Sequence, residues 1–352
     1  MALVFCDGFD HYLGSDLLKK WTGLLNGGTI TLATVRPEYA RPPGGMGINF
    51  NDSNSQRGFY KTLSATHTSF VVGFAVYFGT SAPSNTGAPF LGLYDSSSGV
   101  TNNYQLALRA DSGNHLVVCT GNLGTVLTTS TNTFSANTWY HIELKATINN
   151  TTGTYEVKVN GSSTGWIPAQ TGKNTRGQSS NNYIDVVACM TAALSNVYFD
   201  DFVFFSSASP NNDFAGPVKI ITAFPSGAGN YAQWSGNYAS NFTNVQELAG
   251  DGDGTFNQSA TANQIDTFAV DDMPTGTIVA VQDVIMARQD AGVSRTVRTK
   301  FRSGSSDYSG SSFVLGSSYF FACDPRDVDP ATTSAYTVSN FNAQERGYEL
   351  VS

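Results

Sequence analysis

Carboxylates are the side chains in this 352-residue chain with the greatest capacity for chemistry, and their spacing limits what that chemistry can be. The chain has 21 Asp and 6 Glu, and no glutamate has an acidic residue two or three positions away on an expected strand. Residues two apart on a strand share a face, so this spacing would bring together the acid and base of a sugar hydrolase. The sequence therefore predicts no catalytic residue of this kind.

Four aspartates suggest a different role. Asp7 and Asp10 lie in the first expected strand, and Asp200 and Asp201 lie in the last strand of the first half. Hard cations prefer six to eight oxygen ligands, so a structural calcium is one interpretation, with Asp201 as the best ligand. The other interpretation is that these aspartates form surface pairs and turn hydrogen bonds. The GDGDG stretch at 250–254 lacks the later acidic residue of an EF-hand and is expected to be a tight turn.

Other catalytic arrangements have no signature in the sequence. The chain has four histidines, and none has a companion at metal-ligand spacing. There is no G-x-S-x-G elbow, no P-loop and no dinucleotide fingerprint. We expect from these absences that the protein is not an enzyme.

Aromatic and amide side chains in expected loops offer a way to bind sugars without catalysis. An aromatic ring can stack on the face of a sugar while neighbouring amides bond its hydroxyls. Trp166 is the best candidate because it follows the VNGSSTG turn, although a single tryptophan more often packs into a core. The full set of glycan-binding candidates is Trp166, Tyr94, Tyr104, Tyr183, Asn102, Asn103 and Asn181.

The elements that would position these residues are short strands. The chain has 35 Gly, only 13% charged residues, and clusters of Val, Phe and Tyr between Ser, Thr and Asn turns, which favours strands over helices. In TWYHIELKATI, at 138–148, Trp139, His141 and Glu143 alternate with apolar residues, which predicts one apolar and one mixed face. Strands are also expected at 70–78, 90–95, 103–111, 115–121, 154–161, 184–190 and 196–205.

The net charge and the cysteines indicate which classes of partner and which cellular compartment the chain suits. The net charge of −8 makes nucleic acid a poor partner. The four cysteines show no C-x-x-C pairing, which favours free buried thiols and assembly in a reducing cytoplasm. The amino end has no basic start and no long apolar run, so no signal peptide is expected, and no run is long enough for a membrane span.

The chain is expected to contain two domains. The segment SSASPNNDFAGP has few large apolar residues and two prolines, which indicates a boundary. We predict a first sandwich at 1–207, a linker at 208–217 and a second sandwich at 218–352. Strands expected in the second half are VKIITAF (218–224), 267–272, 276–290, 294–304, 311–316 and 342–352. The predicted fold class is all-β, with two antiparallel β-sandwich domains of jelly-roll type.

A family resemblance adds to this interpretation. FCDGFDHY at 5–12, WYHIELK at 139–145 and YFDDFVFF at 198–205 resemble the concanavalin A-like lectin/glucanase, or laminin G-like, sandwich. The second half, from NDFAGPVKIITAF to NAQERGYELV, resembles a domain appended in structural proteins of tailed bacteriophages. The glucanase branch carries an E-x-D-x-x-E motif, which this chain lacks.

The resemblance implies a structural component of a tailed-phage virion, whether tail, fibre, baseplate or capsid decoration, assembled in the host cytoplasm. Its partners would be other virion proteins, a homo-oligomer such as a trimer, and a host surface polysaccharide presented to its loops. A receptor-binding lectin is the alternative function, and a glycan-degrading enzyme is a third. No heptad or collagen-like repeat enforces a trimer.

Overall fold

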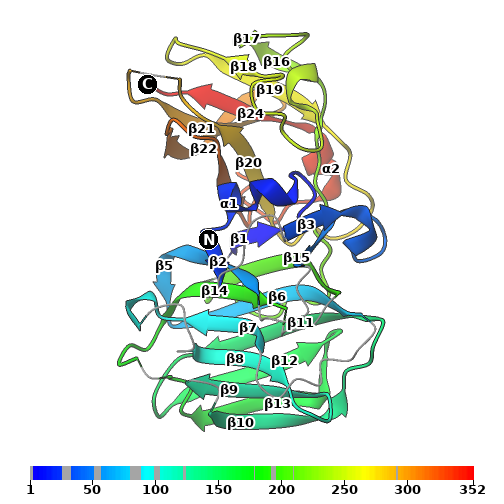
Figure 1. Cartoon of the computed structure of the whole chain (residues 1–352). Helices are drawn as coiled ribbons and strands as arrows, with labels where there is room; N and C mark the ends of the chain where they lie inside the picture. Colours follow the sequence, from blue (N-terminus) through cyan, green and yellow to red (C-terminus); the bar gives the residue numbers. More distant parts are fainter. Residues whose placement is uncertain are drawn as a thin grey trace. The chain divides into compact units, whose positions relative to one another are not determined.

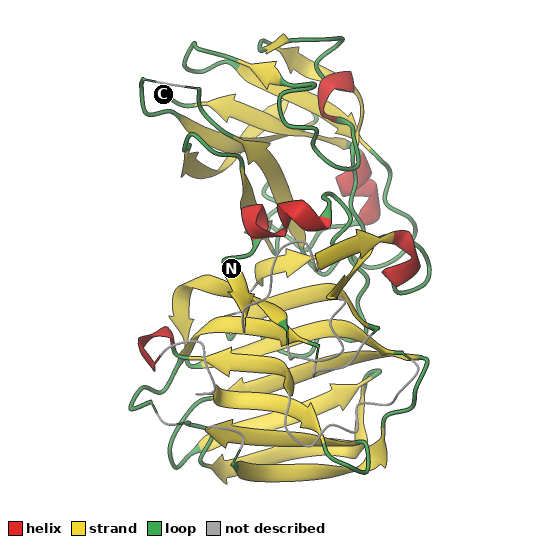
Figure 2. Cartoon of the chain, in the orientation of Figure 1, coloured by secondary structure: helices red, strands yellow, loops and turns green. Residues whose placement is uncertain are grey.

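The computed structural model is built almost entirely of antiparallel strands, as the sequence predicts (Figure 1, Figure 2). It describes residues 3–25, 33–50, 57–79, 89–98, 104–121, 124–177, 179–191, 196–208, 210–290 and 292–352. The chain divides into a first compact unit that ends at Ile220 and a second unit, Ile221–Ser352. Among the described residues no helix is long and apolar enough to cross a membrane.

One sheet of the first unit, sheet A, has its strands in the order β13-β12-β11-β6-β15-β4-β3, and β1 also pairs with β15. The first and last strands of the unit are therefore neighbours. The bounds are β1 Leu3–Asp7, β3 Ala33–Arg36, β4 Gly47–Phe50, β6 Ser69–Phe78, β11 Thr138–Thr147, β12 Gly153–Val159, β13 Ser162–Lys173 and β15 Val197–Ser206.

The other sheet, sheet B, has the order β10-β9-β8-β7-β14-β5-β2. The bounds are β2 Gly23–Leu25, β5 Gly58–His67, β7 Pro89–Tyr94, β8 Tyr104–Ala110, β9 His115–Gly121, β10 Thr125–Thr133 and β14 Ile184–Met190. Short helical turns accompany the sheets: η1 Gly14–Asp16, α1 Leu17–Lys20, η3 Pro37–Tyr39 and η4 Ser96–Ser98.

Alternation along the strands builds the core between sheets A and B. On β6, Phe74, Val76 and Phe78 are fully buried, and on β11 so are Ile142 and Leu144. Buried aromatic and β-branched residues on every second position are what a two-layer sandwich requires.

The edge strands β10 and β13 are tied together by side chains. The Thr131 hydroxyl donates to the Gly165 carbonyl, and the Asn132 amide donates to the Thr164 carbonyl. The two sheets are thus closed against each other at this side of the sandwich.

The second unit has a five-stranded sheet in the order β16-β19-β24-β21-β22 and the separate pair β20–β23. Arg326 of β23 lies over the ring of Phe301 of β21, 4.4 Å from its centroid, so the pair packs on the sheet. The bounds are β16 Pro225–Ala232, β17 Ser235–Gly236, η5 Thr243–Val245, β18 Asn257–Gln258, β19 Ile265–Val270, β20 Val281–Ala287, β21 Thr296–Ser303, β22 Ser306–Val314, β23 Phe320–Arg326, α2 Val338–Asn342 and β24 Gln344–Leu350.

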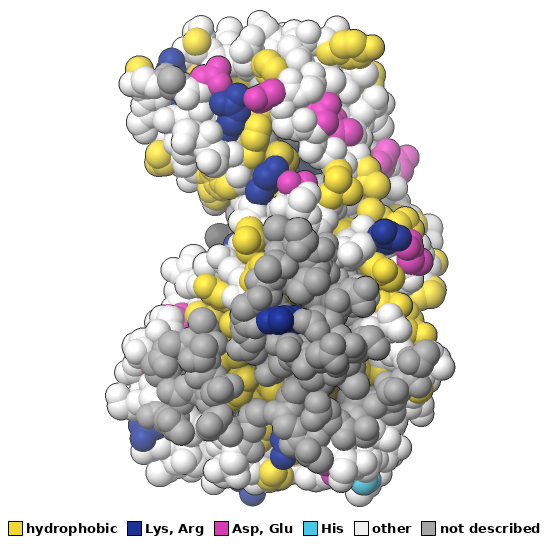
Figure 3. All heavy atoms as spheres, in the orientation of Figure 1, with side chains coloured by type: hydrophobic (Ala, Val, Ile, Leu, Met, Phe, Trp, Pro, Cys, Tyr) yellow, Lys and Arg dark blue, Asp and Glu magenta, His cyan; other side chains and the backbone are white. Residues whose placement is uncertain are grey.

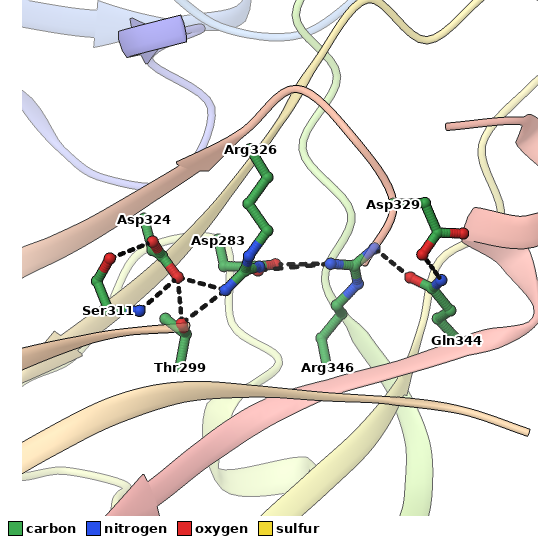
Figure 4. Close-up of polar contacts among 8 residues, drawn as sticks. All are labelled: Asp283, Thr299, Ser311, Asp324, Arg326, Asp329, Gln344 and Arg346. Carbon is green, nitrogen blue, oxygen red and sulfur yellow. Dashed lines mark hydrogen bonds and ion pairs between the residues drawn. The ribbon is translucent and has the colours of Figure 1, made fainter. Parts of the chain in front are cut away.

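A buried polar network lies between these layers (Figure 4). Asp283 of β20 pairs with the guanidinium groups of both Arg326 and Arg346. The Asp324 carboxylate accepts hydrogen bonds from the Arg326 guanidinium and from the Thr299 and Ser311 hydroxyls. Burial lowers the pKa of Arg326 to about 10, a penalty that the paired carboxylates must offset.

The segment VKIITAF at 218–224, which was expected to be a strand, is not one. Its first residues bond side chains of the first unit instead: the Ile220 amide donates to Asp201, and the Val218 carbonyl accepts from Arg41. Backbone groups that are already satisfied in this way are not available for a sheet. The expected linker at 208–217 likewise belongs to the first unit, which extends to Ile220.

Candidate functional site

The outer face of sheet A carries a line of aromatic side chains. Trp139 of β11, Tyr77 of β6 and Tyr198 of β15 are direct partners in the strand register. Tyr77 lies 5.6 Å from Trp139 and 5.0 Å from Tyr198, and Tyr39 of η3 continues the line 4.5 Å from Tyr198. All four rings are partly exposed. We call Trp139, Tyr77, Tyr198 and Tyr39 the aromatic row.

The strand period places the first three rings on this face. Tyr140 and Phe78, next in sequence to Trp139 and Tyr77, point into the core, where they are at most 7% exposed. Since successive side chains alternate across a strand, Trp139 and Tyr77 must face outward. The Tyr77 hydroxyl donates to the Asn137 side chain at 3.2 Å, which helps to orient this inner ring of the row.

Tyr39 reaches the row because η3 lies close against β4. A Cβ atom at Gly47 of β4 would overlap the carbonyl of Tyr39, so only glycine permits this approach. Figure 3 shows hydrophobic side chains gathered over the β3–η3 region. Glu38 of η3, next to Tyr39, forms an exposed ion pair with Arg36, so the row has charged groups beside it.

A buried charge cluster lies next to the aromatic row. Asp200 accepts hydrogen bonds from the Arg41 amide and from Lys219, and Asp201 accepts from the Arg41 guanidinium and the Ile220 amide. Burial and the neighbouring Asp201 carboxylate raise the pKa of Asp200 to about 7, although Lys219 opposes this rise. Asp201 occupies a β-bulge with φ of +52°, which turns its carboxylate toward these donors.

His141 and Glu143 are the next outward residues on β11, and both are buried. Burial, together with Arg41, lowers the pKa of His141 to about 3. Burial raises the pKa of Glu143, although the Gly216 and Ala215 amides that donate to it oppose the rise. In both side chains burial disfavours the charged form, which distinguishes them from a pair of solvated surface residues.

The structure brings several of the predicted glycan-binding residues together on sheet B. The rings of Tyr94 and Tyr104 are 4.8 Å apart, and both are buried. The Asn181 amide donates to Asp95 and to the Tyr183 hydroxyl, beside the same strand ends. Asn102 and Asn103 lie outside the described residues.

Trp166 lies away from this group. It is on β13, with its ring 5.1 Å from Phe134 and 6.2 Å from Tyr140. It packs back onto the sandwich, which was the alternative that the sequence left open.

The aspartates considered for calcium are bonded to protein donors. Asp7 accepts from Lys20, the Trp21 indole and the Tyr12 hydroxyl. Burial alone would raise the pKa of Asp7, but Lys20, His11 and the hydrogen bonds hold it below its usual value. Asp10 accepts from the Met46 amide. The described part of the chain holds no group of three or more metal-ligating side chains.

Sequence reasoning missed the aromatic row. It placed Trp139 on a mixed face, but it looked for sugar-binding rings in loops. The signal was present in the alternation of FVVGFAVYF and NVYFDD, where Tyr77 and Tyr198 are the outward residues. The register that aligns the rings, however, comes from pairing between distant strands.

No family model and no curated protein matches the sequence. Among solved structures, the chain is similar to a PL-14 alginate lyase from Aplysia kurodai, with 13% identity over 58% of this chain and 100% of that one and a TM-score of 0.46. It is also similar to the catalytic domain of a glycoside hydrolase family 131 protein from Coprinopsis cinerea, with 13% identity, 62% and 98% coverage and a TM-score of 0.40. A third is galectin LEC-6 from Caenorhabditis elegans, with 11% identity, 43% and 92% coverage and a TM-score of 0.28.

These neighbours are concanavalin A-like or jelly-roll sandwiches that bind or degrade glycans. They correct the expectation that the chain is not an enzyme, because alginate lyases and glycoside hydrolases are among them. That expectation relied on the absence of local motifs. In a sandwich, side chains from different strands meet on one face, so missing local motifs exclude no activity.

Proposed function

We propose that the first unit recognises a polysaccharide through the aromatic row. The observation that carries this proposal is the alignment of Trp139, Tyr77 and Tyr198 on three neighbouring strands, with Tyr39 beside them. Strands in a sheet are about 4.8 Å apart, and the rings of Tyr77 and Tyr198 are stacked on each other, so the four rings form an extended platform of ring edges and partly covered faces rather than a single pocket. Such a platform suits several consecutive sugars of a chain, each offering an apolar face.

The first prediction is that Trp139→Ala and Tyr77→Ala each weaken polysaccharide binding at least tenfold, because each removes one stacking surface. Binding is measured by affinity electrophoresis and calorimetry against dextran, galactomannan and alginate. Tyr238→Ala is the matched control, since Tyr238 is 80% exposed in the second unit and outside the row. Undiminished binding in the two row variants, with the fold retained, would rule the platform out.

The same panel separates binding from degradation. Incubation of each polysaccharide with the protein is followed by assays for new reducing ends and for the ultraviolet absorbance of unsaturated uronates. Appearance of either product, and its loss in Trp139→Ala, would make the aromatic row the binding part of an active site.

The proposed setting is the surface of a tailed-phage virion, where the chain would assemble with other virion proteins. This part of the proposal is supported by the sequence resemblance alone. Mass spectrometry of purified particles tests it, and sedimentation of the purified protein tests the proposed homo-oligomer.

A further inference from the structure

The segment 213–217, which we call the strap, crosses the outer face of sheet A beside the aromatic row. The Ala215 and Gly216 amides donate to one oxygen of Glu143 at 2.9 and 3.0 Å. Asp213 pairs with Lys145, and the ring of Phe214 lies 4.1 Å from the ammonium group of Lys158. The strap therefore covers the outward residues of β11 and β12 in the direction away from Trp139.

Three polar atoms are buried without partners on Glu143, which the strap amides contact, and on His141, its outward neighbour on β11. Both ring nitrogens of His141 and the second carboxylate oxygen of Glu143 have no hydrogen bond within the described residues. The two side chains are only 2% and 1% exposed. An unsatisfied buried polar atom costs about 1–3 kcal/mol, and folded proteins keep few of them. Such a concentration in two neighbouring residues calls for an occupant.

The contacts that hold the outer part of the strap contribute less free energy than the unsatisfied buried atoms cost. Lys145 and Asp213 are 44% and 71% exposed, and an exposed ion pair contributes about 0–1 kcal/mol. A cation over an exposed ring contributes about 0.5–1 kcal/mol. A ligand that supplies donors to Glu143 and His141 would replace the strap amides and also satisfy the atoms that the strap leaves without partners.

We propose that the strap is displaceable and that Glu143 beneath it, together with the neighbouring His141, extends the polysaccharide-binding face of the aromatic row. This inference rests on the proposed function of the row. Trp139, His141 and Glu143 follow one another along the outward side of β11, across the direction of the aromatic row, so a chain that stacks on Trp139 and turns along this strand would reach the other two. A carboxylate with two accepting oxygens suits a sugar that presents adjacent hydroxyls.

The test combines a released strap with an exchange measurement on the unaltered protein. The double variant Asp213→Ala, Phe214→Ala removes the outer strap contacts and should bind the best polysaccharide of the panel five- to tenfold more tightly. Adding Glu143→Gln should cancel that gain. Asp290→Ala with Tyr238→Ala is the matched control, because both residues are more than three-quarters exposed and lie in the second unit.

In the unaltered protein, saturating polysaccharide should speed hydrogen exchange at the Ala215 and Gly216 amides and leave the strand amides of β11 unchanged. Unchanged affinity in the strap variant, or slower exchange at the strap, would overturn the inference while Trp139→Ala still weakens binding. Absence of any binding by the unaltered protein would instead refute the proposed function and this inference together.

Discussion

His141 and Asp200 are both partners of Ala75 across the outer face of sheet A, yet their pKa values move in opposite directions. The pKa of His141 falls to about 3 because of burial and Arg41, and that of Asp200 rises to about 7 because of burial and Asp201. A histidine with a lowered pKa costs stability as pH falls below 6.5. An aspartate with a raised pKa costs stability as pH rises from about 4 to 7.

The second prediction follows from these opposite dependences of the unfolding free energy on pH. Between pH 4.5 and 6.0, each residue should contribute about 1.4 kcal/mol per pH unit to the free energy of unfolding, with opposite sign. Asp200→Asn should therefore become more stable relative to the unaltered protein as pH rises. His141→Gln should become more stable relative to it as pH falls.

Urea unfolding of both variants at several pH values measures these differences. Differences in unfolding free energy that do not change with pH would show that the two groups titrate normally in the folded protein.

At the same scale, the sequence could identify the residues but not their surroundings. The sequence singled out Asp200 and Asp201 as calcium or surface-pair candidates, but it did not indicate the cations that meet them: Arg41 lies about 160 residues earlier in the chain, and Lys219 lies in a segment expected to be a strand. Neither segment has a sequence pattern from which these contacts could be predicted.

Among the elements, η3 depends on one glycine. The third prediction is that Gly47→Ala lowers the free energy of unfolding by about 2 kcal/mol and weakens polysaccharide binding, because the added methyl group displaces Tyr39 from the row. Chemical denaturation and calorimetry measure the two effects. Gly124→Ala is the control, since a Cβ atom there meets nothing within 4 Å. Equal stability of the two variants would contradict the packing of η3 on β4.

Strand prediction succeeded where alternation or a short apolar run was bounded by turns. The ranges 115–121 and 184–190 match β9 and β14 in full. It failed for VKIITAF, an apolar stretch whose backbone bonds side chains of the first unit. A β-rich composition is a local property, whereas the choice between a ladder and a side-chain partner is decided by tertiary structure.

For the whole molecule, two separate cores predict two unfolding transitions. The fourth prediction is that Asp283→Ala lowers the unfolding free energy of the second unit by about 3–5 kcal/mol and so moves its transition to lower temperature. The variant leaves the buried Arg326 and Arg346 without their shared carboxylate. The transition of the first unit should not move. Differential scanning calorimetry resolves the two.

Asp290→Ala provides the comparison, since Asp290 is 82% exposed and its loss should cost less than about 0.5 kcal/mol. A single transition that shifts as a whole in Asp283→Ala would mean that the two units unfold as one cooperative block.

The side-chain ties between β10 and β13 have a consequence for how crowded copies of this protein behave. An uncovered edge of a sandwich offers carbonyl and amide groups to any passing strand and so promotes aggregation. Here the Thr164 carbonyl already accepts a hydrogen bond from the Asn132 amide, and the Gly165 carbonyl accepts one from the Thr131 hydroxyl. Another chain would have to break these hydrogen bonds before it could pair with the edge, which protects β10 and β13 from aggregation at high local concentration.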